Sequence, residues 1–267
     1  MIEIKNLYKS FGPKHVFTGL NLKIEKGESH VVIGRSGEGK SVLLKHICGL
    51  MQQDAGEVVI AGHAMYRTPE ALRWVRNNVS MVFQMAALFD SLTVYENVGF
   101  FWLENGGKTK AEIDAMVAEL LELVDLPNTQ HLFPPELSGG MRKRVGLARA
   151  LACEPEIILY DEPTTGLDPV TSEVINQLMI RAKSRNKTTS VIITHDMKSA
   201  YAVGDRISML YEGKIIFTGT PQDMQNSSNP FVHQFVNGLA VGPITMDEDE
   251  RVKSTASSVV DRRLVSQ

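Results

Sequence analysis

Residues 34–41 read Gly-Arg-Ser-Gly-Glu-Gly-Lys-Ser and follow the pattern G-x-x-x-x-G-K-[ST]. Glycines allow backbone geometries in which successive N–H groups point at one anion. The helix predicted over residues 42–50 directs the positive end of its dipole at the same point. Lys40 supplies a cation for β- and γ-phosphates, and the Ser41 hydroxyl is a ligand for Mg²⁺. We therefore predict a nucleotide phosphate site made of Gly34, Arg35, Ser36, Gly37, Glu38, Gly39, Lys40, Ser41 and Val42.

Two acids, Asp161 and Glu162, follow the apolar run of residues 157–160. Enzymes with parallel sheets bind ligands at the carboxyl ends of their strands, so Asp161 is placed to hold Mg²⁺. Glu162 is placed to accept a proton from an attacking water. An acidic pair at this place is equally typical of an ordinary turn, and the phosphate loop favours the functional interpretation. His195 follows another apolar run and is expected to reach the γ-phosphate, although a lone histidine is more often structural.

The elements that position these residues are predicted from hydrophobic patterns. Short apolar, β-branched runs at residues 30–33, 58–60, 157–160 and 191–194 are typical of strands buried on both faces of a largely parallel sheet. Helical patterns cover residues 109–124 and 173–182, and Thr109 with Glu112 forms a capping box at the start of the first. Strands that alternate with helices predict an α/β fold.

The domain organisation follows from where the strand signal fades. Residues 90–155 lack a strong buried-strand pattern and are predicted to be a helical insertion in a core of residues 1–89 and 156–238. Residues 239–267 form a C-terminal extension rich in acids, serines and other charges. Two interpretations stay open for it: a solvated tail, or a partner-binding segment docked through Val259, Val260, Leu264 and Val265.

The composition limits the possible classes of protein. The net charge of -3 over 267 residues gives no reason to expect nucleic-acid binding. Two isolated cysteines, Cys48 and Cys153, argue against a disulfide or metal framework and favour a reducing cytoplasm. The N-terminus lacks a signal-peptide pattern, and apolar stretches fall short of the ~18 to 20 residues that a membrane span needs. We expect a soluble protein that reaches membranes through a partner.

Taken in order and spacing, these motifs resemble those of the ABC ATPases from residue 1 to about residue 238. The most specific element is Leu-Ser-Gly-Gly-Met at residues 137–141, which is similar to the family signature LSGGQ. Gln84 matches the family's glutamine loop, residues 166–169 match its aspartate loop around Asp168, and His195 matches its switch histidine. Phe11 stands where the family places an aromatic ring that stacks on adenine, although it is also consistent with plain packing.

The resemblance implies a fold and an assembly. The fold would be a phosphate-loop, RecA-like ABC ATPase core with a mostly parallel sheet, an N-terminal antiparallel β subdomain and the helical insertion. Ser138 is a good N-cap, and Gly139 and Gly140 leave the helix start open to an anion. In the family this signature contacts the γ-phosphate bound to the other subunit, so two copies would enclose two ATP molecules in a head-to-tail dimer. Gln84 would contact Mg²⁺ and sense a membrane permease.

Sub-family marks narrow the resemblance. Met141 replaces the usual glutamine, and LSGGM resembles the ATPases of Mla- and Mce-type lipid transporters, as do residues 87–98 and 229–238. This implies phospholipid transport between bacterial membranes, at the cytoplasmic face of the inner membrane. The implied partners are a permease, an Mce-type lipid-binding protein and a small regulatory subunit.

Two other functions stay open. An importer for amino acids or another polar solute would use the same ATPase with a different partner. A non-transport ABC ATPase that acts on DNA or ribosomes usually carries coiled coils, zinc modules or a second ATPase unit, and the sequence shows none of these. Phe100, Phe101 and Trp102 are assigned either to the permease groove or to the core.

Overall fold

The structure, a computed structural model, describes residues 1–245, with the side chain of Asn186 excepted. The chain forms two compact units, Met1–Gln222 and Asp223–Gln267. All of the residues predicted to do chemistry lie in the first unit. The hydrophobic residues proposed for docking of the tail, from Val259 onward, lie outside the described residues.

A six-stranded sheet crosses the first unit and carries the active-site loops. Its strand order is β10-β9-β3-β8-β7-β6, in which β10 alone runs antiparallel to its neighbour among these six. Strands β3 and β8 are buried along their whole length, as their uninterrupted apolar runs predict. The mostly parallel sheet is thus confirmed. The strands are β3 (Ser29–Ile33), β6 (Val79–Val82), β7 (Ile157–Asp161), β8 (Thr189–Ile193), β9 (Arg206–Tyr211) and β10 (Lys214–Gly219).

A second, antiparallel sheet of order β2-β1-β4-β5 forms the N-terminal β subdomain that the family resemblance implied. The assignment of residues 58–60 to the parallel sheet was wrong, because these residues belong to β4 and pair with β1. Val58 and Ile60 are buried while Val59 between them is only partly covered, and three residues are too few to reveal that alternation. The strands are β1 (Ile2–Phe11), β2 (Lys14–Ile24), β4 (Ala55–Ile60) and β5 (His63–Ala64).

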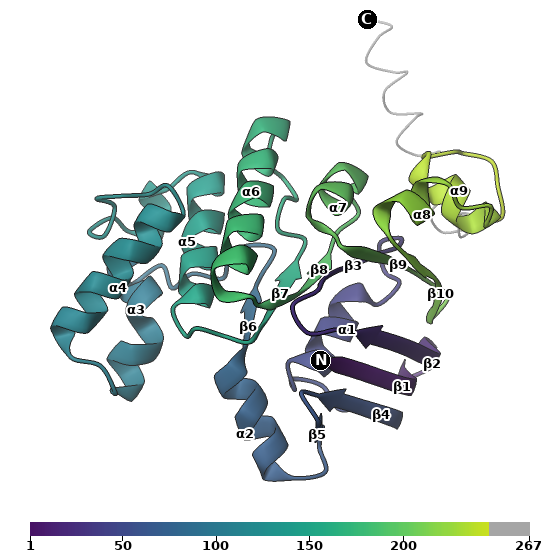
Figure 1. The fold of residues 1–267 in the computed structure, drawn as a ribbon, viewed down its shortest axis with the longest axis horizontal. Coiled ribbons are helices and arrows are strands. Elements are labelled where there is room, and N and C mark those ends of the chain that lie inside the picture. The colour runs from purple at the N-terminus through teal and green to yellow at the C-terminus, as the bar shows by residue number, and fades with distance from the viewer. Residues whose placement is uncertain (246–267) are drawn as a thin grey trace, which may run out of the picture. The chain divides into compact units, whose positions relative to one another are not determined.

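Helices cover both faces of the parallel sheet, as Figure 1 shows: α1 lies on the side of the antiparallel sheet, and α6 and α7 lie on the other side. Leu43, Leu44 and Ile47 of α1 are fully buried between the two sheets and join their cores. The helices of this layer structure are α1 (Lys40–Ile47), α2 (Pro69–Asn78), α6 (Pro169–Asn186) and α7 (Met197–Val203).

Residues 90–155, all of which the structure describes, contain three α-helices and no strand, as predicted for the insertion. These are α3 (Val94–Asn105), α4 (Lys110–Leu123) and α5 (Gly139–Leu151), with a short 3₁₀ helix at Pro134–Glu136. Thr109 and Glu112 form the predicted capping box at the start of α4. Phe100, Phe101 and Trp102 are partly buried, and the Trp102 indole N–H donates to the Ala152 carbonyl at 2.9 Å, which ties α3 to the end of α5.

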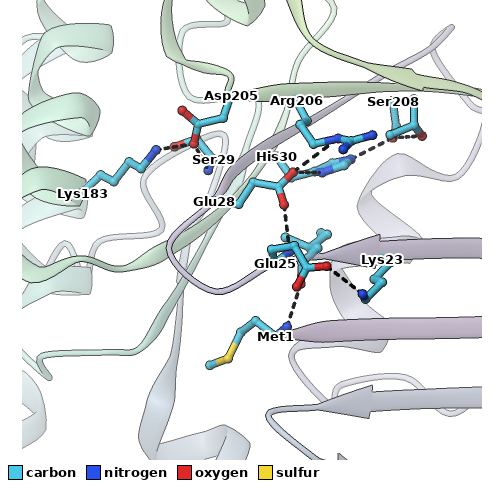
Figure 2. Close-up of polar contacts among 12 residues, drawn as sticks. Met1, Lys23, Glu25, Glu28, Ser29, His30, Lys183, Asp205, Arg206 and Ser208 are labelled. Carbon is cyan, nitrogen blue, oxygen red and sulfur yellow. Dashed lines mark hydrogen bonds and ion pairs between the residues drawn. The ribbon is translucent and has the colours of Figure 1, made fainter.

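A polar cluster closes the end of the sheet opposite the predicted site (Figure 2). The His30 ring is fully buried, with Nδ1 2.8 Å from Glu28 Oε1 and Nε2 2.8 Å from the Ser208 hydroxyl. Glu28 also accepts the Glu25 backbone N–H, and the Arg206 guanidinium lies 4.0 Å away. Burial pushes the pKa of Glu28 up, but the hydrogen bonds from His30 and from that N–H outweigh it and hold the pKa below its ordinary value.

The second unit is described as far as residue 245. It contains most of α8 (Pro221–Gln225) and all of α9 (Pro230–Val236), which Asn229 caps by accepting the backbone N–H of Phe231. The Gln234 side chain donates to the carbonyls of Leu239 and Ile244 and accepts the Ile244 N–H. Within residues 1–245, none of the helices combines the length and apolar character that a membrane span requires.

Candidate active site

The phosphate loop joins β3 to α1 in the strand-loop-helix context that its pattern requires. Gly39 has φ 95°, and a Cβ added there would lie 2.4 Å from a methyl group of Val16, so only glycine fits. The Lys40 side chain is buried and donates to the carbonyls of Gly34 and Arg35, both at 2.8 Å. Burial lowers the pKa of Lys40, and the acids Glu162, Glu38 and Asp161 oppose that shift. The ammonium is thus held inside the loop, where the phosphate oxygens of a bound nucleotide would compete with the two carbonyls for its hydrogen bonds.

A cavity of about 320 Å³ opens beside this loop. It brings together residues that follow four strands, β3, β6, β7 and β8, and that are far apart in the sequence, as the parallel sheet predicts. Its lining residues are Ser36, Gly37, Gly39, Lys40, Ser41, Val42, Gln84, Glu162 and His195.

Ser41 and Asp161 form a donor set that fits Mg²⁺. The Ser41 hydroxyl donates to Asp161 Oδ1 at 3.0 Å, so that a hydroxyl and a carboxylate share one point at the end of β7. Burial raises the pKa of Asp161 despite the hydrogen bond from Ser41, and a divalent cation would restore the preference for the charged form. Gln84, in the loop after β6, lines the phosphate cavity together with Ser41, and its side chain carries an amide oxygen. Hard oxygen donors of this kind suit Mg²⁺.

Glu162 begins the turn after β7 with a left-handed backbone, at φ 50°. Its Oε2 lies 2.8 Å from His195 Nδ1 and accepts the Thr165 hydroxyl at 2.9 Å. The Glu162 backbone N–H donates to the Ile193 carbonyl at 2.9 Å, which fixes the turn against β8. The carboxylate is therefore oriented from two sides at the rim of the phosphate cavity.

The signature residues start α5 and lie outside the lining of this cavity. Ser138 is the N-cap predicted from the sequence, and its hydroxyl accepts the Met141 N–H at 3.2 Å. A Cβ on Gly140 would come within 2.7 Å of a methyl carbon of Thr171, so the start of α5 packs closely on the first turn of α6. Gly139 has open space around its Cα. One chain therefore presents its phosphate loop and its signature at two separate places.

The remaining predicted residues also lie outside this lining. Phe11 is half exposed at the end of β1, with the Lys9 ammonium 5.6 Å from its ring centroid. Glu38 accepts the backbone N–H of Glu212 at 2.8 Å, which anchors the phosphate loop to the turn after β9. Asp168 caps α6 by accepting the N–H groups of Val170 and Thr171.

Three polar residues next to the site were not predicted from the sequence. Thr165 orients Glu162, and Lys143 of α5 donates to carbonyls of the loop that follows Glu162. Arg149, also on α5, donates to the carbonyls of Ala86 and Ala87 at 2.9 and 2.8 Å and so supports the glutamine loop. Both cations stand among the basic residues of an ordinary helix, and only the spacing from the signature could have singled them out.

Comparisons with known proteins agree with this geometry. The sequence model of the ABC transporter family matches residues 17–165. MlaF from Haemophilus influenzae, an intermembrane phospholipid transport system ATP-binding protein, is 36% identical over 245 residues, covering 91% of this chain and 93% of that protein. This chain belongs to the ABC transporter family.

Two further comparisons extend the assignment. The probable ribonucleotide transport ATP-binding protein mkl of Mycobacterium leprae is 40% identical to this ABC protein over 250 residues, covering 93% of this chain and 72% of mkl. The ATP-binding cassette MJ0796, solved as a dimer in a post-hydrolysis state with ADP and Pi, superposes with a TM-score of 0.75 at 33% identity, over 83% of this chain and 99% of MJ0796. The chain is accordingly the ATPase subunit of an ABC transporter, with ATP and Mg²⁺ as its nucleotide and metal.

Proposed function

We propose that the residues at the strand ends divide the hydrolytic work among them. Lys40 and the N–H groups of the phosphate loop hold the β- and γ-phosphates, and Glu162 accepts the proton of the attacking water. Mg²⁺, held by Ser41, Asp161 and Gln84, would neutralise charge on the phosphate oxygens. His195 holds the Glu162 carboxylate through one ring nitrogen and faces the γ-phosphate position with the other. The shared lining of the cavity supports this assignment.

We propose further that the working unit is a head-to-tail dimer with two composite ATP sites. Ser138, Gly139 and Gly140 would contact the γ-phosphate bound to the second copy, and Asp168 would lie near the dimer axis. Phe11 would stack on the adenine. The separation of the signature from the phosphate cavity within one chain supports this arrangement, as does the dimeric form of MJ0796.

A mixed dimer tests the sharing of sites. When one chain carries Ser138→Arg and the other carries Lys40→Ala, both lesions fall in the same composite site and the second site stays intact. We expect this mixed dimer to trap one ATP, whereas either mutant homodimer traps none. Loss of ordinary ATP binding by a Ser138→Arg monomer would place Ser138 in its own chain's site and contradict the arrangement.

The cargo that we propose is phospholipid, moved between the membranes of a bacterial envelope. The observation that carries this proposal is the alignment with MlaF, which spans nine-tenths of both proteins. The LSGGM signature adds to it. The similarity to mkl favours a ribonucleotide as the second candidate, a polar solute moved by the same ATPase with another partner.

We propose that a membrane permease docks around Gln84 and holds the chain at the inner membrane. Apolar side chains flank this residue: Met85 is 84% exposed, and Phe83 and Phe89 are 38% and 44% exposed. Grouped exposed apolar residues of this kind mark interaction sites. An Mce-type lipid-binding protein and a small regulatory subunit would complete the complex.

Transport by the purified complex tests the cargo. The chain is purified from its native membranes with its bound partners and placed in donor vesicles of labelled phosphatidylethanolamine, with unlabelled acceptor vesicles. We expect ATP-dependent transfer of the label, and none with a Glu162→Gln chain. ATP-dependent uptake of a labelled ribonucleotide without lipid transfer would establish the second candidate instead.

A further inference from the structure

Lys143 lies on α5 five residues after Ser138, and the hydrolytic roles proposed above leave it unused. Its ammonium donates to the carbonyl oxygen of Pro163 at 3.0 Å and to that of Thr165 at 2.5 Å. Both acceptors belong to the loop of residues 162–168, here called the Glu162 loop. The signature helix thus holds that loop from outside.

The two carbonyls belong to the turn of residues 162–165, which orients Glu162. The Thr165 N–H donates to the Glu162 carbonyl at 3.2 Å, and the Thr165 hydroxyl donates to Glu162 Oε2 at 2.9 Å. Glu162 itself is left-handed, a conformation that a non-glycine residue keeps only where its surroundings enforce it. A displacement of the Thr165 backbone would therefore carry the Glu162 carboxylate with it.

The surroundings of the ammonium make these two hydrogen bonds hard to replace. The Lys143 side chain is half-buried, and burial lowers its pKa while the charge of Glu162 opposes the shift. Hydrogen bonds from a charged donor are stronger than neutral ones. A neutral side chain of the same length would leave both carbonyls without this donor and would remove one of the two lysine charges, those of Lys143 and Lys40, that interact with Glu162.

The other end of the same helix segment carries the signature. Ser138 and Lys143 are separated by about 7.5 Å along the helix axis, at 1.5 Å per residue. The close approach of Gly140 to Thr171 fixes this first turn of α5 against α6. Because Ser138 and Lys143 lie on one short helix segment, a shift of the helix start would displace Pro163 and Thr165 through the two Lys143 hydrogen bonds.

We propose that Lys143 is a positioning residue that links the signature to the general base of the same chain. In the head-to-tail dimer, which is part of the proposed function, Ser138 contacts the nucleotide of one site while Glu162 of that chain acts in the other. Docking of the signature on one ATP then sets the position of the hydrolytic carboxylate at the second ATP.

Three variants of the full-length protein test this role. Lys143→Met removes the charge at nearly constant length, and Lys143→Arg retains a donor for both carbonyls. Arg144→Met is the matched control. Arg144 is a half-buried cation of the same helix, and it donates to the carbonyls of Val124 and Asp125, away from the Glu162 loop. Each variant is measured for kcat and KM of ATP hydrolysis and for thermal midpoint.

We expect Lys143→Met to lower kcat about tenfold, equivalent to about 1.4 kcal/mol in activation free energy, with KM changed less than twofold. Lys143→Arg should recover at least half of the lost rate, and Arg144→Met should lower only the thermal midpoint. Equal kcat for Lys143→Met and the wild type overturns the proposal. So does an equal loss of kcat in Arg144→Met, because that result indicates general loosening of α5.

Mixed dimers then establish which site Lys143 serves. Two mixed dimers are compared, and in each of them one chain carries Glu162→Gln, so that only the Glu162 of the second chain is active. Lys143→Met on the second chain should slow single-turnover hydrolysis about tenfold relative to the same dimer without it. The substitution on the Glu162→Gln chain should have no such effect, and the reverse pattern overturns the proposal. If ATP produces no dimer, the proposed assembly fails, while the kcat comparison still decides whether Lys143 positions Glu162.

Discussion

Two histidine–glutamate pairs stand at opposite ends of the parallel sheet, and in each an imidazole Nδ1 lies 2.8 Å from a carboxylate oxygen. At the amino ends of the strands, the side chains of His30 and Glu28 are 0% and 8% exposed. At the carboxyl ends, those of His195 and Glu162 are 61% and 13% exposed. The same two residue types thus form one pair that is closed to solvent and one pair that is open to it.

The difference lies in what is left over for a ligand. Both ring nitrogens of His30 are used, by Glu28 and by Ser208, and both Glu28 oxygens have protein partners. A buried network that is fully satisfied stabilises the fold and has no donor or acceptor to offer. The pair at the other end faces the phosphate cavity. Exposure therefore separates the structural pair from the pair that we propose to act in hydrolysis, where residue types and distance do not.

The largest effect that this comparison predicts is that of Glu162→Gln. The amide keeps the size of the side chain but cannot accept the proton of water, so kcat should fall about 10²- to 10⁴-fold. ATP binding should persist, and the closed dimer should accumulate on a sizing column with ATP. The thermal midpoint should match that of the wild type. Turnover near the wild-type rate would show that Glu162 is not the general base.

A smaller effect is expected for His195→Ala, which removes one of the two side-chain partners of Glu162. The loss of a hydrogen bond to a charged group costs about 1.5–3 kcal/mol, so kcat should fall about 10- to 100-fold. His195→Gln, which retains a donor, should fall less. Because the ring is exposed, denaturant midpoints should stay unchanged, and a large drop in midpoint would make His195 a structural residue like His30.

The sequence was sufficient to predict the residues around the phosphate cavity. Strand ends in a parallel sheet meet at one edge, so Lys40, Asp161 and His195 had to converge once their strands were assigned. The helix starts were also predictable, because Ser138 and Thr109 act through neighbouring N–H groups. These inferences all depend on local geometry or on one topological rule.

The features that the sequence could not predict are contacts between residues that are distant in the chain. Residues 58–60 have the composition of a strand in either sheet, and only pairing with β1 decides which. The contact of Lys143 with Pro163 joins positions 20 residues apart through a loop whose course no local pattern determines. The two histidine–glutamate pairs show the same limit, since the contact of His30 with Ser208 depends on the pairing of β3 with β9.

The smallest effect is expected at the closed pair. In Glu28→Gln the carboxylate that accepts hydrogen bonds from His30 and from the Glu25 N–H becomes a neutral amide, which at neutral pH should cost about 1–2 kcal/mol of unfolding free energy. ATP turnover per folded molecule should not change. Glu25→Gln is the matched control, because Glu25 is an exposed partner of Lys23, and an exposed ion pair contributes little.

The pH dependence of that cost separates a charge effect from a packing effect. The pKa of Glu28 is lowered in the folded protein, so its charged form stabilises the fold above the ordinary pKa, and this stability is lost as pH falls through the lowered value. The gap in urea midpoint between wild type and Glu28→Gln should be full at pH 7 and should close below about pH 4. A gap that stays constant from pH 7 to pH 3 would instead assign the cost to altered packing around His30. In that case the charge of Glu28 adds no stability, and the closed pair stabilises the fold through its packing alone.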